Sequence, residues 1–357
     1  MSNFDEALER FHLVDLEYGE GLANHGPMGA EALEQLGHQA LIPAFVGIYV
    51  PRLQPLEPGS PLAAHERDAA LGDVSRRADW IATYEERLAD GDWRAIVATE
   101  LPELLPGIFA GAGHGWLRVA HAIRALEARD EPLRRRELAR GLAYWAARYQ
   151  TLPGLPGSRA RTGATDPEQL LAAWPRVGEP PAREGLFLRV VERLETFPAF
   201  ARAVEQVPAP DAADIPSFIT GLCRAAARLY LAHPEARVAY VHALTIPSAL
   251  RLVLPYLDAT QSGLAALYVL QAAGALHALF GERRDPPPVE TFDGETQRIA
   301  GDWDEIRYHA ACSIQEHSIK MVEACWREDR IAPDPILALA AADAALSIDG
   351  RRQASVC

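Results

Sequence analysis

Apolar residues recur at helical spacing along most of this 357-residue chain, and no other feature constrains its fold as strongly. In residues 78–89, for example, Trp80, Ile81, Tyr84 and Leu88 fall at helical spacing. The other segments with this periodicity are 114–127, 136–150, 219–232, 236–257, 262–280 and 302–326. No run of alternating β-branched and aromatic residues leads into a hairpin turn. The sequence therefore predicts an all-α fold.

Prolines separate these helical segments from one another. Most of the 27 prolines fall between them, where a proline ends one helix before the next begins. Two segments, Thr151–Gly185 and Gly281–Thr296, have the composition of loops or linkers. We expect one multi-helical domain over residues 1–350, followed by a frayed tail at residues 351–357.

A weak internal similarity of the sequence suggests that the chain has two related halves. His114 is followed about one helical hairpin later by Tyr144, and His242 is followed similarly by Tyr268. The halves would be residues 1–150 and 186–350, joined by the Pro- and Gly-rich segment 151–185. Two interpretations stay open: pseudo-repeated halves around a central site, or a chance match between Ala- and Leu-rich helices.

Charge and hydropathy exclude several classes of protein. The formal net charge is −14, which argues against binding to nucleic acid and against binding to anionic lipid through a polybasic segment. Mean hydropathy is −0.09, and we expect no apolar run that approaches the length of a membrane span. The N-terminus lacks the pattern of a signal peptide, and the four cysteines form no C-x-x-C pair. We expect a reduced, cytoplasmic protein.

The chain lacks a dinucleotide fingerprint. The nearest match, Gly111-Ala112-Gly113-His114-Gly115, has G-x-G-x-G spacing and follows a segment with the pattern of a helix or loop instead of a strand. No P-loop, no G-x-S-x-G elbow and no H-E-x-x-H motif occurs either. We expect no bound flavin or nicotinamide, so any chemistry must come from dispersed side chains.

Several of the 11 histidines occupy apolar helical contexts. His25 lies where a helix is expected to begin, with Asn24 as its cap and Pro27 in its first turn. His114 and His121 share one helical face with Arg118, at spacings of i, i+4 and i+7. Arg118 could bind a substrate oxygen or form a buried salt bridge. His242 lies in a helix that is apolar on most sides.

Lys320 is the only lysine in the chain, among basic residues that are otherwise all arginine. It follows His317 by three residues, so the two side chains can converge on one point. Arginine serves a solvated surface as well as lysine, but only lysine can lose its proton and become a nucleophile or a ligand. The apolar surroundings of Lys320 favour the neutral amine, since burial penalises the charged form.

Five segments, in order along the chain, resemble the questin oxidase-like family. They are NHGPM at 24–28, HGWLRVAH at 114–121, AYWAARYQTLPG at 143–154, VHALT at 241–245 and EHSIKMVEAC at 316–325. Fungal members open a ring of anthraquinones by Baeyer–Villiger-type or dioxygenase-type cleavage of a carbon–carbon bond. The resemblance implies an all-helical fold and one non-haem iron bound by four histidines and a lysine that carries a CO2-derived carbamate. The run HAACSIQ at 309–315 departs from the family pattern.

The resemblance also implies which residues bind the metal. The candidate ligands are His25, His114, His121, His242, His317 and the carboxylated Lys320. With five histidines for four places, one is surplus, and the sequence does not say which. Imidazole and a carbamate oxygen both suit Fe(II). Asn24, Glu316 and Glu323 are candidates to hold the second ring nitrogens of the ligands. Lys320 and Arg118 are the candidate catalytic residues.

We therefore expect an oxygenase that acts with O2 on a small aromatic substrate, such as an aromatic polyketide, a quinone or a hydroquinone. Two other classes remain open: an NADPH- or flavin-dependent Baeyer–Villiger monooxygenase, and a non-catalytic helical scaffold. A zinc hydrolase is a further, less favoured alternative, which metal analysis would distinguish from an iron enzyme. The oligomeric state is left undetermined by the sequence.

Overall fold

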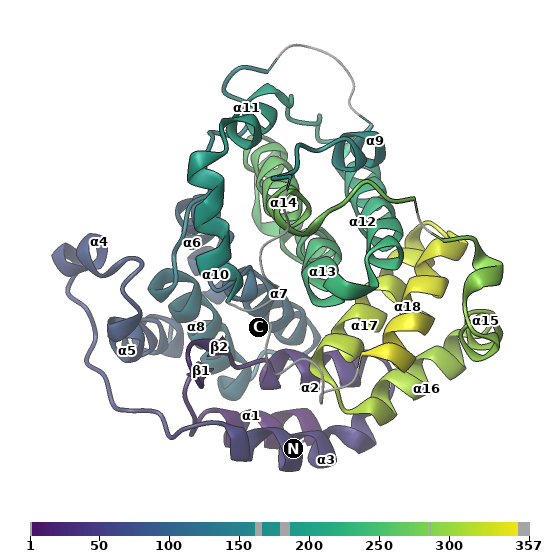
Figure 1. The fold of residues 1–357 in the computed structure, drawn as a ribbon. Helices are drawn as coiled ribbons and strands as arrows, with labels where there is room; N and C mark the ends of the chain where they lie inside the picture. The colour runs from purple at the N-terminus through teal and green to yellow at the C-terminus, as the bar shows by residue number, and fades with distance from the viewer. Residues whose placement is uncertain (1, 161–165, 179–185, 286, 349–357) are drawn as a thin grey trace. The chain divides into compact units, whose positions relative to one another are not determined.

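The computed structural model describes residues 2–160, 166–178, 186–285 and 287–348. Within these residues it contains eighteen α-helices and one two-stranded sheet, so the predicted all-α fold is confirmed (Figure 1). The chain divides into two compact units. The first comprises Met1–Thr151 and Leu252–Asp258, and the second comprises Leu152–Arg251 and Ala259–Cys357. Of the segment expected to join two halves, 151–185, the described residues 152–160 and 166–178 belong to the second unit.

The first unit holds the N-terminal helices and a short hairpin. Its α-helices are α1 (Asn3–Phe11), α2 (Gly26–Gln35), α3 (Ile42–Tyr49), α4 (Arg67–Ala70), α5 (Arg77–Ala89), α6 (Trp93–Leu104), α7 (His114–Ala128) and α8 (Pro132–Ala147). Its 3₁₀ turns are η1 (Gln39–Leu41), η2 (Val50–Arg52), η3 (Ala64–Glu66), η4 (Val74–Arg76), η5 (Leu105–Gly107) and η8 (Leu254–Tyr256). Strands β1 (Glu17–Tyr18) and β2 (Leu22–Ala23) pair antiparallel.

Helix α8 is the centre of this unit, because it packs on both α5 and α7. A Cβ built on Gly115 of α7 would lie 2.6 Å from the Cα of Trp145 on α8, so glycine lets the two helices approach closely. Trp116 packs edge-to-face on Trp145, with ring centroids 5.6 Å apart. This contact fixes the register of α7, on which three of the predicted site residues lie.

The second unit holds the longer helices. Its α-helices are α9 (Pro167–Ala172), α10 (Phe187–Val190), α11 (Pro198–Gln206), α12 (Ile215–Ala232), α13 (Arg237–Val253, whose last two residues fall in the first unit), α14 (Ala259–Phe280), α15 (Gly294–Ile299), α16 (Trp303–Ser313), α17 (Glu316–Ile331) and α18 (Pro335–Ser347). Its 3₁₀ turns are η6 (Val191–Thr196), η7 (Pro234–Ala236) and η9 (Val289–Thr291). Helix α18 packs on α12, α16 and α17.

A buried carboxylate joins three helices of this unit. Asp343 of α18 accepts a hydrogen bond from the Tyr230 hydroxyl of α12 at 2.7 Å. The Arg237 guanidinium of α13 donates to both oxygens of Asp343, at 2.8 and 2.9 Å. Charge-assisted hydrogen bonds of this kind hold helix ends in a defined position.

Some sequence expectations need correction. Residues 302–326, predicted as one helix, form two, because Ile314 has a left-handed backbone (φ 53°) that ends α16 before α17 begins. The predicted linker contains helix α9, and the predicted loop at 281–296 contains η9 and the start of α15. Residues 161–165 and 179–185 of that linker and the expected frayed tail lie outside the described residues.

The expectation about membrane spans was also wrong. Two helical stretches, Pro234–Tyr256 and Ala259–Phe280, are long and apolar enough to cross a membrane, with mean hydropathies of 1.3 and 1.6. Their most apolar windows are, however, 78% and 94% buried inside the protein. Core helices of soluble proteins have the same length and composition, so burial accounts for both stretches without a bilayer.

Candidate functional site

His25 is fixed at the entry to α2. Its backbone N–H donates to the Tyr49 hydroxyl at 2.8 Å, and it is itself the N-cap residue, the position predicted for Asn24. The Asn24 side chain accepts from the Gly26 N–H at 2.9 Å and donates to the Asp15 carbonyl at 2.9 Å. Asn24 therefore stabilises the chain around His25 through backbone groups. Its side chain contacts backbone atoms, whereas the sequence suggested that it orients an imidazole.

His114 begins α7 after three residues with positive φ. Gly111, Ala112 and Gly113 have φ values of 54°, 60° and 86°, which favour glycine and turn the chain sharply. The turn brings the Gly111 carbonyl within hydrogen-bonding distance of His114 Nδ1. The element directly before this turn is the 3₁₀ turn η5 instead of a strand, so the segment lacks the strand–turn–helix context of a dinucleotide site.

His25 and His114 face each other in the interior of the first unit. Their Nε2 atoms are in direct contact, and the rings are stacked with centroids 4.3 Å apart. A carbonyl only accepts, so the contact with Gly111 assigns the proton of a neutral His114 to Nδ1 and leaves a lone pair on Nε2. The two facing nitrogens are close enough to share a proton or to bind one cation. Both residues are buried, at 1% and 4% exposed.

His121 forms a buried pair with a carboxylate. Its Nδ1 lies 2.7 Å from Glu31 Oε2, and Arg124 also donates to Glu31, with Nε at 2.8 Å from Oε1. Burial alone would raise the pKa of Glu31, but Arg124 and His121 together lower it to about 2. Glu31 is therefore ionised and fixes the orientation of His121, as carboxylates do for metal-bound histidines.

Arg118 has the buried salt bridge that was one of its two predicted roles. Its Nε and Nη2 donate to the two oxygens of Glu137 on α8, at 2.6 and 3.0 Å. His12 Nε2 lies 3.3 Å from the same carboxylate. The Nη1 of Arg118 is buried without a hydrogen-bond partner among the described residues. A contact between Arg118 and a substrate stays a prediction.

The second unit contributes its own pair of histidines. His242 on α13 and His317 on α17 are buried, with ring centroids 5.6 Å apart and planes tilted by 56°. Phe187 packs edge-to-face on His242, with ring centroids 5.7 Å apart. The histidines of the VHALT and EHSIK segments, 75 residues apart in the sequence, thus come together in this unit.

Lys320 is buried one turn after His317. It is 2% exposed, and its neighbours Ile319 and Met321 are fully buried. This excludes an ordinary solvated lysine. Glu323, proposed to hold a ligand histidine, accepts from Arg327 Nη1 at 2.7 and 2.9 Å, and its role toward a histidine stays a prediction.

The other proposed acid, Glu316, precedes His317 directly in α17. Glu316 Oε1 lies 4.0 Å from His317 Nδ1, just beyond hydrogen-bonding distance. Sequence reasoning missed two groups that contact predicted ligands, the Gly111 carbonyl beside His114 and the Glu31 carboxylate beside His121. Glycines before His114 could have indicated a special turn, whereas no local signal singles out Glu31.

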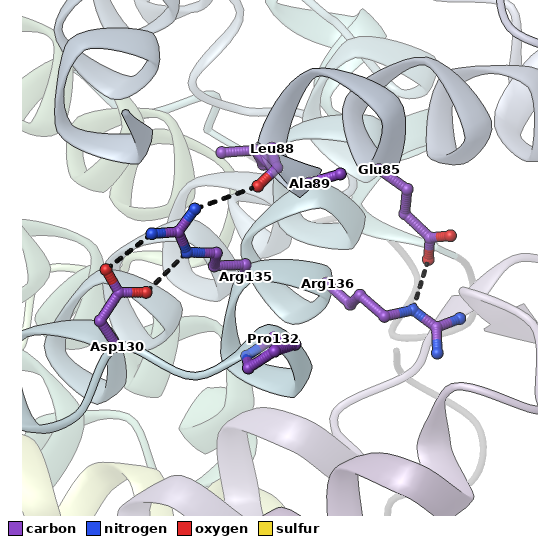
Figure 2. A pocket seen from close by; sticks show the side chains of 7 residues that line it. All are labelled: Glu85, Leu88, Ala89, Asp130, Pro132, Arg135 and Arg136. Atoms are coloured by element: carbon purple, nitrogen blue, oxygen red, sulfur yellow. Dashed lines mark hydrogen bonds and ion pairs between the residues drawn. The ribbon is translucent and has the colours of Figure 1, made fainter. Parts of the chain in front are cut away.

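A separate cleft of about 550 Å³ lies on the first unit between α5 and α8. Figure 2 shows that its arginines turn to carboxylates: Arg135 donates to Asp130 at 2.6 and 2.9 Å, and Arg136 donates to Glu85 at 3.3 Å. Every guanidinium in this cleft is thus neutralised. The cleft contains none of the predicted site residues, so it does not change the assignment of the site.

No family model matches this chain, and no curated protein matches it. The assignment of the site consequently rests on its geometry and on the sequence motifs. That geometry supports the coarser part of the prediction: buried histidine nitrogens converge so that they could hold a metal ion.

Proposed function

We propose that this protein is a non-haem iron-dependent oxygenase that acts with O2 on an aromatic, quinone-type or polyketide-type substrate. The reaction would be oxidative cleavage of a ring carbon–carbon bond or a Baeyer–Villiger-type oxidation. The observation that carries the proposal is the facing pair of His25 and His114, with one imidazole locked by a backbone carbonyl. Imidazole nitrogens arranged in this way suit a transition metal.

The proposed ligands are His25, His114, His242, His317 and a carbamate on Lys320. That ligands from both units serve one ion comes from the resemblance of the sequence motifs. The donor chemistry fits, because each histidine is buried and Lys320 is the one basic side chain able to accept CO2. When bound, Fe(II) would supply the electrons and the open coordination position that O2 chemistry requires.

The chain's own residues would orient and shield the reacting groups. The Gly111 carbonyl fixes the tautomer of His114, and Glu31 holds the Nδ1 side of His121. Buried Arg118 brings a positive charge to the same face of α7, with Glu137 holding its orientation. The spare Nη1 of Arg118 is a donor for an anionic oxygen, which is the form in which a phenolic substrate gives up electrons most readily.

Metal content tests the ligand set. Lys320→Arg should keep the helix, since both residues favour helices, but should lose the iron, because arginine cannot be carboxylated. Arg330→Lys on the same helix is the matched control; Arg330 is exposed, and its guanidinium lies over Trp326. Elemental analysis and circular dichroism of both variants decide the matter. A folded Lys320→Arg protein with full iron would remove Lys320 from the site.

Stoichiometry tests whether both units serve one ion. One iron per chain, lost on substitution of either His25 or His242 by alanine, is the expected result. Two ions per chain, or loss on one side alone, would contradict it. The same measurement on His121→Ala decides whether His121 is the surplus histidine or a ligand.

Cofactor dependence separates this proposal from a flavin- or NADPH-dependent monooxygenase. The iron-loaded protein should consume O2 in the presence of a hydroxylated anthraquinone without added NADPH or flavin. An O2 electrode with mass spectrometry of the product is the assay. A strict requirement for NADPH in an iron-loaded preparation would reject the proposal.

A further inference from the structure

A second cleft, of about 570 Å³, lies within the second unit and contains none of the residues proposed to bind iron. The lining residues used below are Glu168 and Ala172 of α9, Arg176 after it, Arg228 and Leu229 of α12, and Arg283 after α14. The volume falls in the range of pockets that enclose small organic ligands. The cleft calls for its own explanation because of its charges.

Four arginines line the cleft with three carboxylates, Glu168, Glu282 and Asp285, but they do not pair one to one, and among the described residues Asp285 forms no ion pair. Arg284 forms ion pairs with both Glu282 and Glu235, the latter at 2.9 Å. Arg228 Nε lies 3.5 Å from Glu168. Among the described residues no carboxylate forms an ion pair with the remaining two, Arg176 and Arg283. The cleft thus offers two guanidinium groups without an anionic partner, in contrast to the cleft in Figure 2.

Arg176 is held in place without being neutralised. Its Nη1 lies 3.4 Å from the Ala172 carbonyl and 3.4 Å from Nε2 of His277. His277 is fully buried, and its other nitrogen, Nδ1, lies 2.8 Å from the Tyr240 hydroxyl. Burial and the charge of Arg176 lower the pKa of His277 to about 3, so the imidazole is neutral. Both contacts use Nη1, which leaves Nε and Nη2 of Arg176 as donors for a ligand.

We propose that this cleft binds a small organic phosphate monoester. Its phosphate would be held by Arg176 and Arg283, and its carbon skeleton would lie against Ala172 and Leu229. The two unpaired guanidinium groups outnumber the one unpaired carboxylate, Asp285, so the cleft favours an anion, and the planar guanidinium fork matches phosphate oxygens geometrically. The site is independent of the proposed oxygenase activity.

Calorimetry on the full chain tests the site, with phenyl phosphate as the organic probe, inorganic phosphate as the minimal one and citrate as a carboxylate competitor. Phenyl phosphate should bind saturably at low ionic strength, more tightly than citrate and more tightly than inorganic phosphate, which lacks the apolar part. Arg176→Gln should weaken binding by roughly tenfold or more, the usual effect of losing one charge-assisted contact.

Arg298→Gln is the control, because Arg298 lies elsewhere in the same unit, is exposed and pairs with Glu305. Its affinity for phenyl phosphate should equal that of the unsubstituted protein. If Arg176→Gln does not fold, Arg283→Gln takes its place, since the side chain of Arg283 is exposed and lies outside the core. An equal loss in Arg298→Gln, unchanged affinity in the cleft variant, tighter binding of citrate, or no saturable heat with phenyl phosphate would each overturn the proposal.

Discussion

The buried carboxylate of Glu137 offers the sharpest test of how the first unit is held together. It binds Arg118 through two hydrogen bonds, of 2.6 and 3.0 Å, and His12 at 3.3 Å. The side chains of Glu137 and Arg118 are only 4% and 1% exposed. Glu137→Gln preserves the shape of the side chain but removes its charge, which leaves the guanidinium of Arg118 buried without a counter-ion.

The magnitude follows from the same contacts. Burial would raise the pKa of Glu137, but attraction to Arg118 and the hydrogen bond with His12 lower it from 4.5 to about 2. At about 1.4 kcal/mol per pKa unit, the native environment favours the ionised form by roughly 3 kcal/mol. Breaking a buried ion pair by removing one partner costs about 3–5 kcal/mol. We expect Glu137→Gln to lower the free energy of unfolding by about 3–5 kcal/mol at neutral pH.

The pH dependence has a definite sign. The folded-state pKa lies below the unfolded one, so the stabilisation is fully present above about pH 4.5. It is lost progressively as the pH falls from 4.5 towards 2, where the folded protein also takes up the proton. The difference between the unsubstituted protein and Glu137→Gln should therefore shrink in this window.

Urea unfolding followed by far-UV circular dichroism, at pH 7 and at pH 3, measures both effects. Glu127→Gln is the matched control, because Glu127 pairs with Arg94 at 3.2 Å on the surface, with both side chains 49% exposed. An exposed pair contributes about 1 kcal/mol or less. The reasoning is refuted if Glu137→Gln costs no more than Glu127→Gln, or if its cost is the same at both pH values.

Three further outcomes are expected. Gly115→Ala should lower the free energy of unfolding by about 1–3 kcal/mol, and with it the melting temperature, because the new Cβ would lie 2.6 Å from the backbone of Trp145. Gly47→Ala is the control and should be neutral or slightly stabilising, because a Cβ there would meet no atom within 4 Å. Asp343→Asn should cost about 2 kcal/mol in urea unfolding, since it weakens the paired hydrogen bonds from Arg237, and an unchanged midpoint would contradict this. Chelation should abolish O2 uptake without changing the far-UV spectrum, and iron should restore it; restoration of a hydrolytic activity by zinc would favour the zinc hydrolase.

The sequence predicted individual helices well where one face is apolar. The segment predicted at 78–89 is α5, Arg77–Ala89, and the segment at 262–280 lies within α14, Ala259–Phe280. Periodicity predicts these helices because each buries one continuous apolar face, and the residues of that face recur every three or four positions in the sequence. It fails at Ile314, whose left-handed conformation interrupts an apolar pattern that continues on both sides.

The candidate site shows the same division. The sequence by itself singled out His25, His114 and Lys320, because histidines on apolar helix faces and a single lysine can be recognised without a structure. The contact between the Gly111 carbonyl and His114 is local, three residues apart, and the glycines before His114 indicate a special turn. Only the tertiary structure decided that Glu31 is the partner of His121, across 90 residues.

Local spacing determines which face of a helix is apolar, and so the sequence determined the all-α class and the burial of the candidate ligands. The partner of a buried polar group is different, because it depends on which helices pack together. The carboxylate of Glu137 meets His12, 125 residues away, only because α8 packs on α1 and α7. A buried charge must find its counter-charge wherever packing places one, and no pattern local to the sequence specifies that place.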